Sequence, residues 1–403
     1  MDNCFCLLQE VDMFNFSTPV NRYGTYCTQW DYVEDRFGEA DLLPFTISDM
    51  DFAVAPCIEK ALSERLAHGV FGYSRWNHDD FKSAITGWFS RRYHSPINPE
   101  HIVYGPSVIY IISQLVMQWT KQGEGVLIHT PAYDAFGNML AANDRLMLTS
   151  PLLKTAGGSY EIDWAQFEAQ AAKPECKVLL LCSPQNPTGR VWTRDELSRM
   201  AQICLQNQVK VISDDIHMDM AFNDYIPWPE VALDDNWALV SSGSKSFNIP
   251  ALTGAYAFIA DQTVRERYLT QLKAAHGLSS PSILGVIGHI AAYNQGEVWL
   301  DSLKDYLQAN LRYVAEQLNQ AFPELNYQVP EGTYLAWIDL TPLSVDMDAL
   351  QQRLIGHYKV AIMRGDTYGQ EGQGYVRLNV GCPRSKVETG LKALMSALHD
   401  LKH

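Results

Sequence analysis

The sequence predicts an α/β fold, a mostly parallel, doubly wound sheet with helices on both faces and a smaller α+β domain after it. Continuous apolar runs alternate with helical patterns through the middle of the chain, which indicates strands covered on both faces. From about residue 290 the pattern changes to a long helix, short strands and a final helix. We therefore expect a large domain over residues 51–290 and a small C-terminal domain over residues 291–403.

Four apolar runs are the expected parallel strands, and they cover residues 125–129, 177–182, 209–213 and 237–241. After the second run, Thr193 and Glu196 have the spacing of a capping box, which predicts a helix from Thr193 to Asn207. Strand–helix–strand units of this kind build a parallel sheet. The other expected helices cover residues 56–68, 79–93, 107–120, 298–322 and 386–401, and two expected C-terminal strands cover residues 334–338 and 375–380.

Composition limits the classes of function. Lys and Arg number 31 against 46 Asp and Glu, a formal net charge of −15, which argues against a nucleic-acid partner or attachment to an anionic membrane. The eight cysteines show no metal-ligand spacing, so we expect reduced thiols, no metal and a cytoplasmic protein. The N-terminus lacks the pattern of a signal peptide, and the most apolar helical stretch, residues 108–119, is too short to span a bilayer.

Lys245 is the candidate catalytic residue. It follows the expected strand 237–241 and lies among the small hydroxyl residues of Ser242-Gly243-Ser244-Lys245-Ser246. A lysine at a strand end can form an imine with an aldehyde cofactor, and the neighbouring Ser242 and Ser244 can bind the phosphate of such a cofactor. Most lysines simply lie in solvent at the surface. The catalytic assignment of Lys245 is therefore supported mainly by residues at the neighbouring strand ends.

Two earlier strand ends carry partners for a pyridoxal phosphate ring. Asn186, Asp214 and Lys245 are separated by 28 and 31 residues, enough for helical crossovers, so they can converge beyond the carboxyl ends of parallel strands. Asp214 can keep a pyridinium nitrogen protonated, and Asn186 can donate to the phenolic oxygen. Taken singly, each also fits a cap or a turn. His217 can support this edge of the ring or simply pack; Asp215 points elsewhere if the segment is extended.

Three further residues are binding candidates. Ser107 begins a helix whose free amides can meet a phosphate. Tyr133 follows a strand end and can stack on a pyridine face or fill the core. Arg377 lies on an apolar strand, where an unpaired charge is unfavourable, so it pairs either with a substrate carboxylate or with an internal Asp or Glu.

These motifs carry a family resemblance. Residues 183–189, 213–219 and 242–248 resemble fold-type I pyridoxal-phosphate enzymes of the aminotransferase superfamily, and residues 47–52, 68–76, 130–136 and 375–384 resemble the MalY/PatB-type C–S lyases. The resemblance runs in order from about Met13 to the C-terminus. Residues 1–12 lie outside it, and our hypothesis is that Met13 is the natural start.

The resemblance implies a seven-stranded sheet, an N-terminal segment over residues 1–50 that packs with the small domain, a homodimer and pyridoxal 5′-phosphate as cofactor. It implies that Lys245 binds the cofactor and then moves the Cα proton. It implies that the cofactor ring is contacted by Asp214, Asn186, His217 and Tyr133, and that the cofactor phosphate is bound by Ser107, Val108, Ser242 and Ser244. The substrate would be bound by Arg377 and Ser48. Tyr73 would take part in catalysis and substrate binding in the partner subunit's site.

The activity that the resemblance implies is β-elimination, the conversion of L-cystathionine to homocysteine, pyruvate and ammonia, together with cysteine or cystine desulfhydration. It also implies a second role, restraint of the maltose-regulon transcription activator. An aminotransferase shares the first proton abstraction, and no residue decides between the two by physics alone. A mainly regulatory protein-binding role is the alternative from a different class.

The chain departs from the family pattern in two places. Aminotransferases usually carry an arginine eight residues after the lysine, where this chain has Thr253. The segment Met363-Arg364-Gly365-Asp366 replaces a Pro-Gly-small pattern. We expect the charges of Arg364 and Asp366 to lie near the substrate mouth, which leaves substrate preference open.

Overall fold

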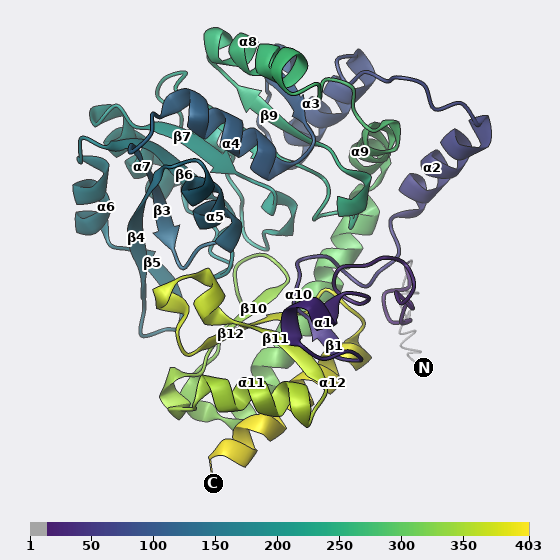
Figure 1. Ribbon diagram of the computed structural model, residues 1–403, viewed down its shortest axis with the longest axis vertical. Helices are drawn as coiled ribbons and strands as arrows, with labels where there is room; N and C mark the ends of the chain where they lie inside the picture. Colours follow the sequence, from purple (N-terminus) through teal and green to yellow (C-terminus); the bar gives the residue numbers. More distant parts are fainter. Residues whose placement is uncertain (1–13, 403) are drawn as a thin grey trace, which may run out of the picture.

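The computed structural model describes residues 14–402 and contains two sheets (Figure 1). The hypothesis about Met13 concerns a segment outside these described residues. The larger sheet has the strand order β2-β9-β8-β7-β6-β3-β4-β5 and the smaller one the order β1-β11-β12-β10. The strands are β1 (Leu43–Phe45), β2 (Ile102–Gly105), β3 (Gly125–Thr130), β4 (Leu146–Lys154), β5 (Tyr160–Ile162), β6 (Cys176–Cys182), β7 (Lys210–Asp214), β8 (Trp237–Ser241), β9 (Ala255–Ile259), β10 (Leu335–Asp339), β11 (Val360–Arg364) and β12 (Tyr375–Asn379).

The centre of the larger sheet is parallel, which confirms the predicted fold class. Strands β4, β3, β6, β7 and β8 pair in parallel, and β9 and β2 add antiparallel pairings on one side. All residues of β8 are buried, as are all but the first of β7, because helices cover both faces. The sheet has eight strands, where seven were expected, since the short β5 pairs with the edge of β4.

Helices on the two faces begin and end close to the predicted residues. The capping box of Thr193 and Glu196 is present at the start of α7, and Gly69 ends α2 in the left-handed conformation. The helices are α1 (Val33–Phe37), α2 (Pro56–His68), α3 (Asp79–Tyr93), α4 (Val108–Trp119), α5 (Asp134–Ala142), α6 (Trp164–Ala171), α7 (Arg194–Gln206), α8 (Gln262–Thr270), α9 (Ile283–Gln295), α10 (Glu297–Ala321), α11 (Met347–Gly356) and α12 (Arg384–Leu401).

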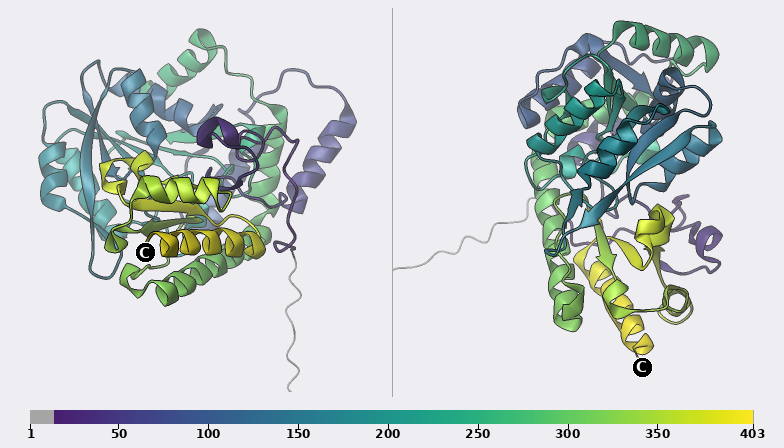
Figure 2. Two further views of the ribbon diagram at one scale, coloured as in Figure 1. Left: turned by 60° about the horizontal axis from the view of Figure 1, so that its bottom comes forward. Right: turned by 90° about the vertical axis from the view of Figure 1, so that its left-hand side faces the viewer.

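The long helix α10 runs from the larger sheet to the smaller one (Figure 2). In the smaller sheet, β1 from the N-terminal part of the chain pairs in parallel with β11, far away in sequence. The domain boundaries expected from the sequence stay a prediction. Within residues 14–402, no helix is long and apolar enough to cross a membrane, and all six cysteines are free.

A strap formed by residues 46–52 joins the two sheets through its backbone. Asn379, at the end of β12, donates to the carbonyls of Ile47 and Asp49 at 2.6 and 2.8 Å. Asn248, which follows β8, donates to the carbonyls of Met50 and Phe52, both at 2.8 Å. These side-chain amides satisfy backbone groups that an irregular segment would otherwise leave unpaired. The strap is thereby held against both sheets at once.

Replacing Gly390 of α12 by alanine tests how tightly β1 packs on the C-terminal helix. An added Cβ would overlap the buried ring of Phe45, so we expect a loss of about 1–3 kcal/mol of stability and a lower melting temperature. Gly356→Ala in α11 is the matched control. A Cβ there meets nothing within 4 Å, and alanine favours helix, so this variant should melt no lower than the wild type. Equal melting temperatures for both variants would contradict the tight packing.

Candidate active site

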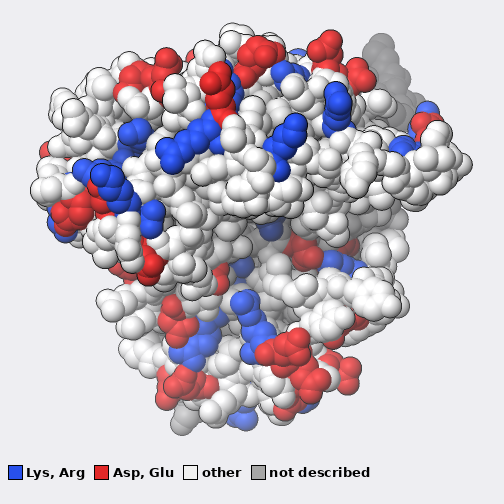
Figure 3. All heavy atoms as spheres, turned by 45° about the horizontal axis from the view of Figure 1, so that its top comes forward, with Lys and Arg blue, Asp and Glu red and all other residues white. Residues whose placement is uncertain are grey.

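A cavity of about 460 Å³ lies at the carboxyl ends of β6, β7 and β8, between the two sheets. Figure 3 shows a recess between the two parts of the molecule, with basic groups inside it. Ligands bind at this edge of open α/β sheets. Most predicted site residues line the cavity, namely Ser48, Ser107, Val108, Tyr133, Asn186, Asp214, His217, Ser242, Ser244, Lys245 and Arg377. Tyr73 does not, and its side chain is fully exposed.

Lys245 reaches the cavity from the loop that follows β8. Its Nζ donates to the carbonyl of Ser48, in the strap, at 2.6 Å. Burial lowers the pKa of Lys245 to about 8; Arg377 lowers it further, while Asp49 and Asp214 oppose the change. A lysine with this pKa is neutral in about a tenth of the molecules at pH 7, far more than an ordinary lysine, and the neutral amine is the form that acts as a nucleophile or a base.

The last residue of β7, Asp214, faces the cavity. Burial raises its pKa to about 7, against a hydrogen bond from the Ile216 amide at 3.2 Å and the nearby Lys245. Asp215 does not line the cavity and accepts a hydrogen bond from Ser213 at 2.8 Å. The alternation of an extended chain separates the two carboxyl groups, so only Asp214 can meet a ligand there.

Arg377 and Asn186 meet across the cavity wall. Arg377 donates to the Asn186 Oδ1 at 3.0 Å and to the carbonyl of Thr46 at 2.7 Å, and its guanidinium lies 4.6 Å from the centre of the Tyr368 ring. Among residues 14–402 it forms no ion pair with an Asp or Glu, and its buried Nε has no partner. The internal carboxylate that the sequence left open is therefore not present, and the positive charge is available to a ligand.

Two aromatic side chains complete the wall. Burial lowers the pKa of His217 to about 3, so its imidazole is neutral, and within the described part of the chain its Nδ1 has no hydrogen-bond partner. Tyr133 is half-buried at the start of α5, and burial raises its pKa. Both side chains line the cavity, where they can contact a flat ring.

The start of α4 offers an anion site. Ser107 caps this helix by accepting from the Tyr110 amide at 3.1 Å, and Val108 is its first residue. Free amides at a helix start bind phosphate. Ser242 is already engaged, because its hydroxyl donates to the Gly254 carbonyl at 2.8 Å. Thr253, at the position of the usual arginine, also lines this part of the cavity.

The two charges expected near the substrate mouth do not line the cavity, and their influence on substrate preference stays a prediction. Arg364 and Asp366 pair with one another, and Arg364 also pairs with Asp348. Neither Arg364 nor Asp366 lines the cavity, whereas Met363 does. Successive side chains of a strand point to opposite faces, so Arg364, the last residue of β11, points away from the face on which Met363 lies.

Sequence reasoning missed several residues of the cavity wall. Arg36 comes from α1, Thr46 from the strap and Tyr368 from the loop after β11. None belongs to a motif at a strand end, so no local signal marked them. Asp134 also lines the cavity, and its position directly after Tyr133 was the one available indication.

The residues present fit pyridoxal phosphate. The cavity contains the amine of the half-buried Lys245 for the aldehyde, a buried carboxyl group for the ring nitrogen and a helix start for the phosphate. His217 Nδ1 and Arg377 Nε are buried polar atoms without partners in residues 14–402. Such atoms are rare in folded proteins, and here they surround a space that can hold a polar ligand.

Comparisons with known proteins agree with this geometry. A family model described as aminotransferase class I and II matches residues 40–394. The chain is 59% identical over 392 residues to Protein MalY of Escherichia coli (strain K12), covering 97% of this chain and all of that protein. It is 34% identical over 388 residues to cystathionine beta-lyase PatB of Bacillus subtilis (strain 168), covering 95% of this chain and all of the relative.

Solved structures that contain pyridoxal phosphate are also similar to this chain. Cystalysin from Treponema denticola, whose structure contains a pyridoxal 5′-phosphate cofactor, superimposes with a TM-score of 0.91 at 28% identity and covers 96% of this chain and 100% of its own. The PLP-bound C–S lyase from Staphylococcus hominis gives a TM-score of 0.90 at 28% identity and covers 96% and 98%.

The amine of Lys245 should become reactive between about pH 7 and 9. With a pKa of about 8, it loses its proton as the pH rises through this range, well below the ordinary value of 10.5. The measurement is the rate at which pyridoxal phosphate attaches covalently to cofactor-free protein, trapped by borohydride at each pH. Lys245→Arg should show no attachment. A midpoint near pH 10.5 would contradict the burial of the amine.

Proposed function

We propose that L-cystathionine is a substrate of this chain. The premise is that the chain belongs to the aminotransferase class I and II family and is a pyridoxal-phosphate-dependent carbon–sulfur lyase within it. The products would be homocysteine, pyruvate and ammonia. The observation that carries the proposal is that one cavity contains both a half-buried, partly neutral Lys245 and an Arg377 that lacks a carboxylate partner in the described residues.

The residues around the ring position have complementary roles. Asp214 would hold the ring nitrogen, Tyr133 the ring face, and the start of α4 the phosphate. Asn186 would meet the phenolic oxygen, because its Oδ1 already accepts from Arg377 and its amide NH₂ therefore points away and is free to donate. When bound, the cofactor supplies an electron sink for negative charge at the substrate Cα.

Arg377 would bind the substrate carboxylate in a two-pronged contact and so orient the Cα–H bond. The neutral amine of Lys245 takes the Cα proton. The electron pair of that bond forms the Cα–Cβ double bond, while the Cβ–S bond breaks and its pair leaves with sulfur. The thiolate takes up a proton and becomes homocysteine, and the three-carbon fragment reacts with water to give pyruvate and ammonia.

Transamination is the competing chemistry, and it begins with the same proton abstraction. The two differ in whether the leaving group departs or the proton returns to the cofactor. The resemblance to relatives named as C–S lyases favours elimination, and L-cysteine and L-cystine are further substrates of the same class.

We also propose a homodimer in the cytoplasm. Leu66, Val70, Phe71 and Tyr73 are exposed apolar or aromatic side chains on and after α2, a helix that projects from the body of the molecule (Figure 1). A second copy would cover them, and Tyr73 would then reach the partner subunit's cavity. Restraint of a transcription activator stays a prediction from the resemblance; a Lys245→Ala variant that still restrained maltose genes would separate it from catalysis.

Turnover of L-cystathionine without any 2-oxo acid tests the proposed reaction. We expect equal amounts of homocysteine, measured with a thiol reagent, and pyruvate, measured with lactate dehydrogenase. Lys245→Ala should lower turnover at least a thousandfold, because it removes both the cofactor link and the base. Strict dependence on an added 2-oxo acid would show a transaminase instead.

A further inference from the structure

Two opposite charges at the cavity wall have no role in the chemistry above. Arg36 lies in the last turn of α1, and Asp134 is the first residue of α5. Both line the same cavity as Lys245 and Arg377. They come from segments almost 100 residues apart in sequence, so the fold places both at one cavity without any local motif.

Neither charge is neutralised within residues 14–402. Arg36 and Asp134 form no ion pair with each other or with another side chain. The hydrogen bond of Arg36 goes to the Met363 sulfur at 3.4 Å, which is a weak acceptor. By contrast, Arg364, which lies outside the cavity, pairs with two carboxylates.

The position of Arg36 relative to Arg377 is set by the smaller sheet. Met363 and Arg377 are opposite one another in the pairing of β11 with β12, and Met363 is the residue that Arg36 contacts. Arg36 therefore contacts the residue that is paired with Arg377 in the sheet. Burial raises the pKa of Tyr133, Asp134 adds to this, and Arg36 opposes it, so both charges also act on the wall that faces the ring position.

We propose that Arg36 and Asp134 bind the distal amino-acid head of the substrate, Arg36 its carboxylate and Asp134 its ammonium group. This inference rests on the proposed function. L-Cystathionine has two zwitterionic heads joined through sulfur, and Arg377 can hold the carboxylate of only the one that reacts. The second head needs a cation and an anion side by side at the mouth. The pair thus selects L-cystathionine over cysteine derivatives with plain alkyl chains.

An ordinary surface role is the competing explanation. Arg36 is exposed, and an acidic residue in the first turn of a helix, as Asp134 is, stabilises the helix dipole. In that case neither residue would distinguish one substrate from another.

Three substrates separate these explanations. L-Cystathionine has the full distal head, S-(3-carboxypropyl)-L-cysteine keeps the carboxylate without the ammonium group, and S-propyl-L-cysteine has neither. For Arg36→Gln, kcat/KM for each of the first two, relative to S-propyl-L-cysteine, should fall about 10- to 100-fold, the effect of one charged hydrogen bond. For Asp134→Asn, only the value for L-cystathionine should fall.

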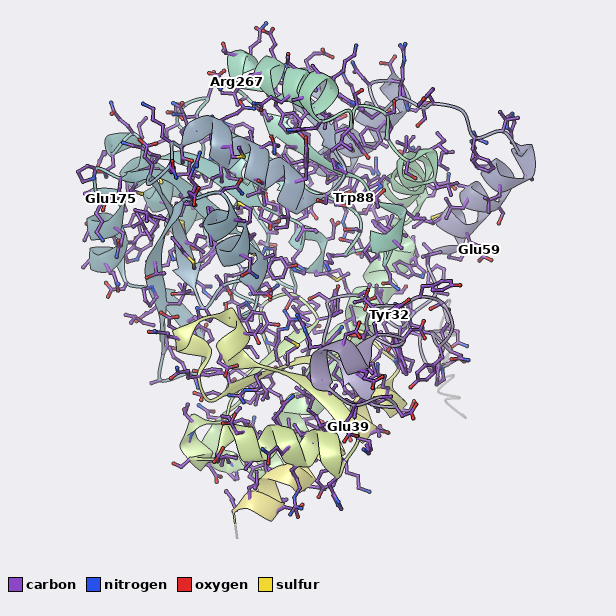
Figure 4. All side chains as sticks on the ribbon, viewed as in Figure 1. Tyr32, Glu39, Glu59, Trp88, Glu175 and Arg267 are labelled. Carbon is purple, nitrogen blue, oxygen red and sulfur yellow. The ribbon has the colours of Figure 1, made fainter. Side chains whose placement is uncertain are left out.

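Arg267→Gln is the matched control. Arg267 is an exposed arginine in the last turn of α8, and Figure 4 shows it at the top of the molecule, well away from Tyr32, the residue before α1. This variant should keep the wild-type ratios. Cofactor absorbance confirms that each variant is folded and loaded.

A binding measurement makes the test independent of turnover. In 2,7-diaminosuberate a methylene replaces the sulfur, so no thiolate can leave. Its Kd, measured by calorimetry, should rise about 10- to 100-fold in Arg36→Gln, while that of 2-aminoheptanoate stays within twofold. Unchanged ratios and unchanged Kd would overturn the distal site and leave the proposed lyase intact. Failure of the wild type to cleave L-cystathionine, with the Kd still dependent on Arg36, would refute the reaction but support the distal site.

Discussion

The properties of the site depend on one constraint. Ionisable groups are removed from water where the two sheets meet. Asp214 and Arg377 are buried and Lys245 is half-buried in one cavity, and none of the salt bridges in residues 14–402 involves them. Burial favours the neutral amine of Lys245 and lowers its pKa to about 8. Burial also favours the neutral carboxyl group of Asp214 and raises its pKa to about 7. A site in this condition favours a ligand that supplies an aldehyde, a basic ring nitrogen and a carboxylate.

The strap formed by residues 46–52 maintains this arrangement. Its carbonyls at Ser48 and Thr46 accept from Lys245 and Arg377, while Asn379 and Asn248 hold it from the two sheets. Arg22 adds ion pairs to Asp49 and Asp51 at 2.8 and 2.9 Å, which tie the strap to the preceding segment. The position of each catalytic group is therefore a consequence of how both sheets pack, which helps explain why the site lies between them.

Much of the fold and of the central site could be predicted from the sequence, because both follow from local rules. Apolar runs mark buried strands, and polar residues at their carboxyl ends must share one edge of the sheet. The choice of Asp214 over Asp215 follows from the alternation of side chains along an extended chain.

Other features depend on contacts between distant segments, and the sequence does not contain them locally. Arg36 reaches the cavity because β1 pairs with β11. Arg364 looked like an unpaired charge near the mouth, but it pairs with Asp348 and does not line the cavity. Ser242 looked like a free phosphate donor, but it is occupied by the carbonyl of Gly254.

The most direct test of the central claim is the protonation state of the cofactor's ring nitrogen, read from the ¹⁵N chemical shift of labelled pyridoxal phosphate bound to the protein. The buried Asp214 should keep this nitrogen protonated at neutral pH, and Asp214→Asn should move the shift to that of the unprotonated ring while Lys245 remains attached. A nitrogen that is unprotonated in the wild type, or a shift that Asp214→Asn leaves unchanged, would contradict the account.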